Sequence, residues 1–150
     1  NGDTHSQIIR DKRKMSTFKS RDLLPFKAGI KAGADMIMVS HNIVDAFDKK
    51  HPASLSKKVH KYIRNEMNYD GVIITDGLGM NGVVDFVGGD KGEAAIKSVL
   101  AGNDMLCTND YKIQYPAVLE AVKDGKIKEK QIDESVKRIL ILKLNRKIIK

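Results

Sequence analysis

One short pattern occurs twice in this chain, and it constrains the fold more than any other feature of the sequence. Ala32-Gly33-Ala34-Asp35-Met36-Ile37-Met38 returns as Ala101-Gly102-Asn103-Asp104-Met105-Leu106-Cys107. In each copy a glycine ends a segment with helical periodicity, and a short apolar run follows the glycine. A third apolar run, Val72 to Ile74, lies about midway between the copies. Helices that alternate with short apolar strands indicate β/α units, which need a parallel sheet.

The pattern predicts three strands, Asp35–Ser40, Val72–Thr75 and Asp104–Cys107. Three strands cannot close a barrel, and a (β/α)8 barrel typically needs about 250 residues. The chain has 150 residues. The pattern therefore leaves two α/β architectures open: a small open sheet, or the last part of a (β/α)8 TIM barrel.

An aspartate directly follows the central strand. Val72 to Ile74 is entirely apolar and β-branched, as expected for a strand buried on both faces, and it is followed by Thr75 and Asp76. A carboxylate at the end of a buried strand is costly unless it meets partners or substrate. In parallel α/β folds, active sites lie at the carboxyl ends of the strands. Asp76 is therefore the first candidate for chemistry, and the alternative is an aspartate that merely caps the next turn or helix.

The segments around the strands carry further predictions. Ser54 is predicted to cap a helix whose apolar face is Leu55, Val59, Tyr62, Ile63 and Met67. His60 is predicted on the solvated face of that helix, and Cys107 is predicted to be a small buried hydrophobe. Pro116 is predicted to open a later helix.

Composition argues against several classes of function. The 27 lysines and arginines exceed the 19 aspartates and glutamates, but aromatic residues make up only 5%. A solvated lysine-rich surface is therefore favoured over nucleic-acid binding. No apolar run approaches the roughly 20 residues of a membrane helix, so no membrane segment is expected. One cysteine excludes an internal disulfide framework, no His, Asp and Glu cluster has metal-ligand spacing, and we expect no metal and no cofactor.

A glycine-rich stretch offers an alternative from another class of function. Gly77-Leu78-Gly79-Met80-Asn81-Gly82 fits the G-x-G-x-x-G pattern of dinucleotide sites and follows a strand. Such sites also need an acidic partner at the end of the next strand, where Cys107-Thr108 stand instead. A nucleotide-binding open sheet is the alternative that this stretch supports.

The first residues do not resemble a natural start. Asn1-Gly2-Asp3-Thr4 is turn material without an initiating methionine, so we expect a processed or truncated piece. The sequence indicates no compartment, because any export signal would precede Asn1.

Several motifs, in order, resemble the catalytic domain of glycoside hydrolase family 3, and within it the β-N-acetylglucosaminidase branch. The motifs are Asp35 to His41, Pro52 to Ser56, Arg64 to Met80, Ala101 to Leu106 and Ile132 to Leu140. Asn1 to Thr4 is similar to the end of the family's K-H-F-P-G-x-G-D-T segment. The resemblance implies that residues 1–150 are the C-terminal portion of a single (β/α)8 catalytic domain, with the three predicted strands as the sixth, seventh and eighth. It also implies that the N-terminal portion of the same barrel is a necessary partner.

The resemblance also implies roles for individual residues. Asp76 aligns with the family's nucleophile, which forms a covalent glycosyl-enzyme. Asp3 and His5 have the spacing of the branch's acid/base dyad, displaced from its usual place; the alternative is a turn aspartate beside an exposed loop histidine. His41 and Met80 match positions near the sugar, with packing as the alternative for Met80.

The function expected from the resemblance is a retaining exo-β-glycosidase that hydrolyses terminal β-N-acetylglucosaminides or related β-glycosides. A β-glucosidase of the same family is the second hypothesis. An inactive fragment or carbohydrate-binding remnant, which lacks the N-terminal sugar-binding residues, is the third. In each case the expected ligand is a carbohydrate.

Overall fold

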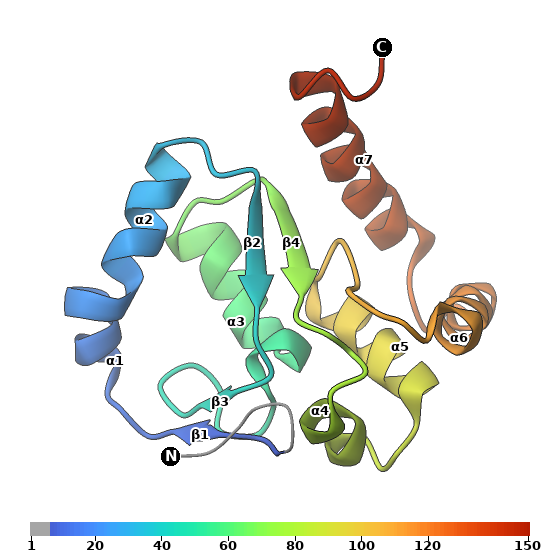
Figure 1. The fold of residues 1–150 in the computed structure, drawn as a ribbon, viewed down its shortest axis with the longest axis horizontal. Coiled ribbons are helices and arrows are strands. Elements are labelled where there is room, and N and C mark those ends of the chain that lie inside the picture. The colour runs from blue at the N-terminus through green and yellow to red at the C-terminus, as the bar shows by residue number, and fades with distance from the viewer. Residues whose placement is uncertain (1–6) are drawn as a thin grey trace.

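The computed structural model describes residues 7–150. Helical segments separate most of the strands as far as Thr75, and four helices then follow with only an isolated bridge at Met105 among them (Figure 1). The strands are β1 Arg10–Asp11, β2 Met36–Val39, β3 Ile43–Val44 and β4 Val72–Thr75. The α-helices are α1 Met15–Thr17, α2 Leu23–Lys31, α3 Lys57–Lys61, α4 Asn81–Phe86, α5 Lys91–Ala101, α6 Tyr111–Lys123 and α7 Glu129–Asn145. π-Helical turns at Phe18–Asp22 and Tyr62–Glu66 continue α1 and α3, and a 3₁₀ turn covers Ala53–Leu55.

The central pair of strands, β2 and β4, is parallel, as predicted. Met36 pairs with Val72, and the register runs on to Val39 opposite Thr75. Alternate residues of a strand face opposite sides of the sheet. Val39 and Ile73 therefore share one face, where they form a buried core with residues of α3 and the turn that follows it. A second parallel pair, β1 with β3, lies beyond the end of β2.

The segment Asp104–Cys107 is not a regular strand, which corrects the prediction. It forms one parallel bridge, between Ile74 and Met105. The Thr75 N–H donates to the Met105 carbonyl at 3.2 Å, but the Cys107 N–H donates to Thr75 Oγ1 at 3.0 Å. Because a side chain replaces the backbone acceptor there, the ladder stops. The segment still lies on the far side of β4 from β2, in the sequential order of neighbouring β/α units.

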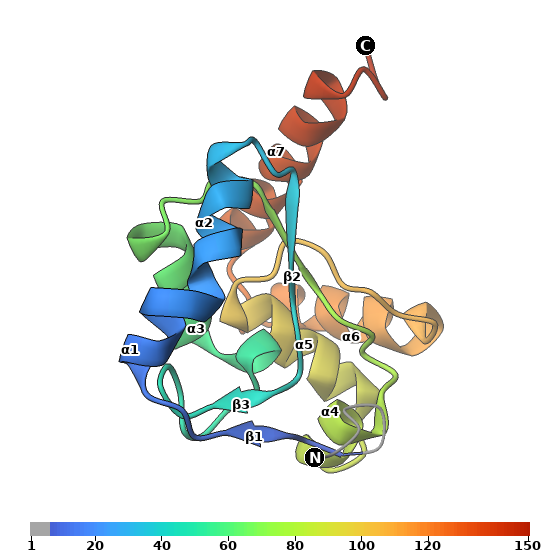
Figure 2. The ribbon, with the colours of Figure 1, turned by 60° about the vertical axis from the view of Figure 1, so that its left-hand side comes forward.

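Helices cover one face of the central pair and leave the other face of β2 open. Figure 2 shows α2 and α3 on the same side of β2. On the opposite face, the Met36 and Met38 side chains are 38% and 57% exposed, respectively. Leu24 and Phe26 of α2 are exposed as well. The open side of β2 is therefore apolar.

The helix after β3 differs from its prediction at the cap and on one face. Ser56, rather than Ser54, caps α3, and its Oγ accepts the Val59 N–H at 3.3 Å. His60, predicted on the solvated face, is 3% exposed, and its Nδ1 lies 2.9 Å from the Ser56 carbonyl. The cause is close packing by the end of α5, since a Cβ added at Gly102 would lie 3.1 Å from the His60 Cβ. Periodicity within one helix could not reveal this second contact.

Three other local predictions are also wrong. From its glycines, the stretch between Met80 and Gly92 is predicted to be a loop, but it contains α4. Pro116 lies inside α6 rather than at its start, because the first turn closes earlier, on the Asp110 carbonyl. Cys107 is exposed, at the point where the bridge with β4 ends.

The last helix, α7, stands out from the body of the molecule toward the C-terminus (Figure 1). Four of its apolar side chains are exposed: Val136, Leu140, Ile141 and Leu144. Arg146 just beyond α7 forms an ion pair with Asp35 just before β2, with 2.7 Å between Nε and Oδ2. Within residues 7–150, no helix is both long enough and apolar enough to span a membrane.

Candidate active site

The carboxyl ends of the parallel segments bring together three of the predicted site residues, Asp76, His41 and Met80. The Asp76 N–H, just past the end of β4, donates to the Val39 carbonyl of β2 at 3.0 Å. Two residues later, the Leu78 N–H donates to the Cys107 carbonyl at 2.9 Å. The chain that carries Asp76 is therefore held from both neighbouring segments. This is the sheet edge where parallel α/β proteins build their sites.

The Asp76 carboxylate is half-buried and has few partners. Its Oδ1 accepts the N–H of Gly77 at 2.7 Å. Among residues 7–150, no second donor and no cationic side chain bonds to the Asp76 carboxylate. One carboxylate oxygen is thus oriented by the backbone, and the other is left for a ligand. A carboxylate held in this way can act as a nucleophile or a base.

His41, two residues beyond β2, lies beneath the turn that follows Asp76. Its ring is 1% exposed, with Nδ1 2.7 Å from Ser54 Oγ and Nε2 3.0 Å from the Gly77 carbonyl. Burial lowers the pKa of His41, and the charge of Asp76 opposes this only in part, so the ring is neutral at pH 7. A contact between His41 and the sugar stays a prediction.

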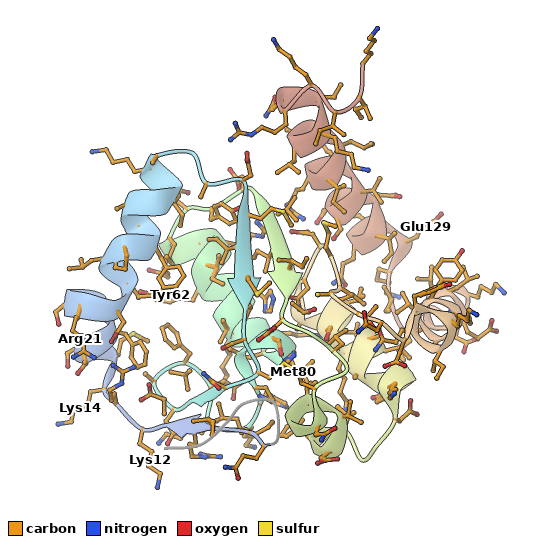
Figure 3. All side chains as sticks on the ribbon, in the orientation of Figure 1. Lys12, Lys14, Arg21, Tyr62, Met80 and Glu129 are labelled. Carbon is orange, nitrogen blue, oxygen red and sulfur yellow. The ribbon has the colours of Figure 1, made fainter. Side chains whose placement is uncertain are left out.

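The Met80 side chain packs at the far end of the same turn. Its N–H donates to the Gly77 carbonyl at 3.1 Å, which closes the turn. The side chain is partly buried against the core of Leu78 and Val83. A Cβ added at Gly77 would lie 3.8 Å from Met80 Sδ, so Met80 borders the loop of the proposed nucleophile. In Figure 3, Met80 lies beyond the carboxyl ends of β2 and β4. Sugar binding by Met80 stays a prediction.

The proposed dyad, Asp3 and His5, lies outside the described residues. The described chain begins nearby, at Gln7, whose backbone packs against Gly82 of α4: a Cβ added at Gly82 would lie 2.8 Å from the Gln7 carbonyl carbon. The Ile9 carbonyl accepts the N–H of Ile43 in β3 at 2.9 Å. Residues 7–9 therefore run past the carboxyl-end loops.

Ser54, which the sequence predicted to be a helix cap, also lies at this edge. Its side chain is completely buried and contacts His41 rather than a helix end. No local pattern signals this contact, because it joins two loops of the chain. Within residues 7–150, no group of three His, Cys, Asp or Glu side chains converges as a metal site.

The chain matches known proteins over most of its length. The model of the family described as "Glycosyl hydrolase family 3 N terminal domain" matches residues 1–142. A beta-hexosaminidase of Methylococcus capsulatus (strain ATCC 33009 / NCIMB 11132 / Bath) is 32% identical over 123 residues, which are 82% of this chain and 36% of that protein. A beta-hexosaminidase of Xylella fastidiosa (strain M23) is 40% identical over 82 residues, 54% of this chain and 24% of that protein.

A solved structure agrees with these relatives. The glycoside hydrolase family 3 beta-N-acetylglucosaminidase from Paenibacillus sp. str. FPU-7 superposes with a TM-score of 0.91 at 37% identity, covering 98% of this chain and 29% of that one. The chain thus spans roughly a third or less of the length of these relatives. On the family match and the identity to its relatives, the chain belongs to glycoside hydrolase family 3.

Proposed function

We propose that this chain carries the nucleophile of a retaining exo-β-glycosidase that acts on terminal β-N-acetylglucosaminides or related β-glycosides. One observation carries the proposal: Asp76 stands at the carboxyl end of β4 with one carboxylate oxygen free of bonds to residues 7–150. The family membership makes a sugar the expected ligand. The names of the relatives favour an N-acetylhexosamine.

The proposed reaction has two steps. In the first, the Asp76 carboxylate attacks the anomeric carbon, the bond from that carbon to the leaving oxygen breaks, and an acid protonates that oxygen. In the second, water attacks the same anomeric carbon, the bond from that carbon to the Asp76 oxygen breaks, and the same group, now a base, takes the proton of the water. Asp76 is suited to the first step because no hydrogen bond from residues 7–150 to its second oxygen has to break when that oxygen attacks.

We assign the acid/base role to His5, with Asp3 as its partner. The support is the spacing of the two residues and the course of Gln7 to Ile9, which pass the loops beside Asp76. A histidine suits the role because its ordinary pKa of about 6.5 lies near neutral pH, and a carboxylate stabilises its charged form. His41 and Met80 are proposed to border the sugar.

The proposal places the chain as the last three β/α units of a (β/α)8 barrel. The parallel order of β2, β4 and the bridged segment 104–107 supports this. The exposed Met36 and Met38 are also accounted for, since in a barrel that face would point into the packed interior. The complete barrel, meaning this chain joined to the N-terminal portion of its barrel, is the expected active species.

The decisive experiment measures hydrolysis by the complete barrel, with Asp76→Asn and Asp70→Asn compared. Asp70 is a matched control, because it is an exposed aspartate just before β4. We expect Asp76→Asn to lower kcat on the order of 10⁴-fold and Asp70→Asn to leave it unchanged. A fluorinated glycosyl substrate should label Asp76 itself, detected by peptide mass.

Two aryl glycosides separate the alternatives. Turnover of the β-N-acetylglucosaminide supports the leading proposal, whereas turnover of the β-glucoside alone supports a β-glucosidase. No turnover of either by the parent protein would identify an inactive or carbohydrate-binding form. Full activity of Asp76→Asn would remove Asp76 from the mechanism.

A further inference from the structure

Resting on the proposed function, we propose that His41 is a positioning residue: with Ser54 behind it, it fixes the turn that follows the nucleophile. This role goes beyond the sugar contact expected from the sequence. It needs no contact between His41 and substrate.

The peptide unit between Gly77 and Leu78 is bonded at both ends. Its N–H, on Leu78, donates to the Cys107 carbonyl at 2.9 Å. Its carbonyl, on Gly77, accepts two hydrogen bonds, from the Met80 N–H at 3.1 Å and from His41 Nε2 at 3.0 Å. The His41 bond is the one that ties this peptide to the segment after β2. Among the described residues, the other hydrogen bonds of this peptide unit lie within the turn and to the segment 104–107.

The hydrogen bonds also define the state of the ring. A carbonyl oxygen can only accept, so His41 Nε2 must carry the proton that meets Gly77. The neutral ring then has a lone pair on Nδ1, and Ser54 Oγ donates its hydrogen to it at 2.7 Å. The order of donation is Ser54 to His41 to Gly77.

Ser54 is itself fixed to the core. Its N–H donates to the Ser40 carbonyl at 3.0 Å, and its carbonyl accepts from Asn103 Nδ2 at 2.7 Å. Ser54 is fully buried, and Asn103 is 2% exposed. The series of hydrogen bonds that ends at Gly77 therefore begins at buried atoms of the core.

The turn needs this support because of its composition. Gly77 and Gly79 follow Asp76, and glycine allows many more backbone conformations than other residues. The Gly77 N–H orients Asp76 Oδ1 at 2.7 Å. A rotation about the backbone bonds of Gly77 would move this N–H and release the carboxylate. By holding the Gly77 carbonyl, His41 limits that rotation and so holds the nucleophile in its orientation.

The test uses two variants of His41, each with an amide in the position of one of the two ring nitrogens. The amide of asparagine lies one bond beyond Cγ, like Nδ1, whereas the amide of glutamine lies beyond a further carbon, like Nε2. In the complete barrel, His41→Asn should keep the contact with Ser54, lose Gly77, and lower kcat by about 10- to 100-fold. His41→Gln can donate to Gly77 and should recover most of kcat. KM should change little in both, because the positioning role acts through the Gly77 carbonyl and needs no contact between His41 and the sugar.

Three outcomes overturn the proposal: kcat of His41→Asn within about twofold of the parent, equal loss of kcat in both variants, or a change confined to KM, which would indicate a sugar contact. Ser54→Ala, a smaller change, covers the case in which His41→Asn does not fold. It should lower kcat several-fold, and an unchanged kcat would contradict the role of Ser54.

A matched control is His60→Gln. His60 is also a buried histidine whose ring meets a backbone carbonyl, that of Ser56, but it does not contact the turn after Asp76. It should lose thermal stability while keeping kcat. The Asp76→Asn variant, measured beside it, separates the two levels of failure. If Asp76→Asn is active, the proposed function fails; if only the His41 variants behave like the parent, the positioning role alone fails.

Discussion

Two aspartates at opposite ends of the same parallel sheet have opposite surroundings. Asp104 lies at the amino end, with its side chain 1% exposed. Its Oδ2 accepts from Arg64 Nη2 at 2.5 Å and from the Ile73 N–H at 2.8 Å. Its Oδ1 accepts from Ser135 and Arg138, both at 3.0 Å. Asp76, at the carboxyl end, has one bond within the described residues, to the next N–H of its own chain.

The difference separates a structural carboxylate from one available for chemistry. Four donors, two of them guanidinium groups, occupy both carboxylate oxygens of Asp104. Asp76 has one carboxylate oxygen that forms no hydrogen bond with residues 7–150. Residue type alone does not decide the role of an aspartate at a strand end; the number of protein donors around it does.

The strongest test of this contrast measures both stability and turnover in a variant of each aspartate. Asp104→Asn should lower the free energy of unfolding of the complete barrel by about 3 kcal/mol, because two partly buried arginines lose their buried counter-charge. Asp76→Asn should change that free energy by less than about 0.5 kcal/mol, because it breaks no ion pair. Chemical denaturation measures both values.

Turnover by the folded protein should show the reverse order, with a large loss in Asp76→Asn and a small one in Asp104→Asn. Equal stability losses in the two variants would show that the carboxyl end is as much a structural site as the amino end.

A smaller effect distinguishes the two arginines that bind Asp104. Arg64 also donates to the carbonyls of Tyr69 at 2.9 Å and Gly71 at 2.6 Å, and its side chain is 17% exposed. Arg138 is 28% exposed and bonds to Asp104 alone among the described residues. We expect Arg64→Met to cost about 3 kcal/mol and Arg138→Met about 1 kcal/mol of unfolding free energy. If Arg138→Met costs as much as Arg64→Met, the extra carbonyl bonds contribute nothing.

The smallest expected effect is a dependence of stability on pH. Burial lowers the pKa of both His41 and His60. Below about pH 6.5 these histidines are therefore protonated more in the unfolded chain than in the native state. Because the unfolded state binds more protons, the free energy of unfolding falls as the pH falls. The fall is at most about 1.4 kcal/mol per pH unit for each histidine. Denaturation at pH 7.5 and 5.5 measures it.

The variant His60→Gln should reduce this fall, since it removes one of the two groups. A stability that is flat between these pH values in the parent would show that both rings take up protons in the folded protein.

The sequence predicted the local parts of this molecule well and the long-range parts poorly. The strand predicted at Asp35–Ser40 is found at Met36–Val39, and Val72–Thr75 has its predicted bounds. The predicted ends of two helices near Gly33 and Gly102 are also confirmed. The prediction of a regular third strand is wrong, because the Cys107 N–H donates to Thr75 Oγ1 and not to a backbone carbonyl of β4. The prediction that His60 lies on the solvated face of α3 is wrong, because the end of α5 covers its side chain.

At the candidate site, the sequence placed Asp76 at the end of a buried strand, but it did not predict the contact between Ser54 and His41. These residues are brought together by the loop that follows β2. The roles of Asp76, Asp3, His5, His41 and Met80 in catalysis or binding stay predictions.

The sequence by itself determined that helices and parallel strands alternate, and that a carboxylate follows the central strand. Such features depend on periodicity and glycine positions within a few residues, which a linear reading contains. Only the tertiary structure decided which aspartate is surrounded by donors and which is left free. That depends on partners such as Arg138 for Asp104 and His41 for the turn after Asp76, which lie far away in sequence and meet only when the segments pack.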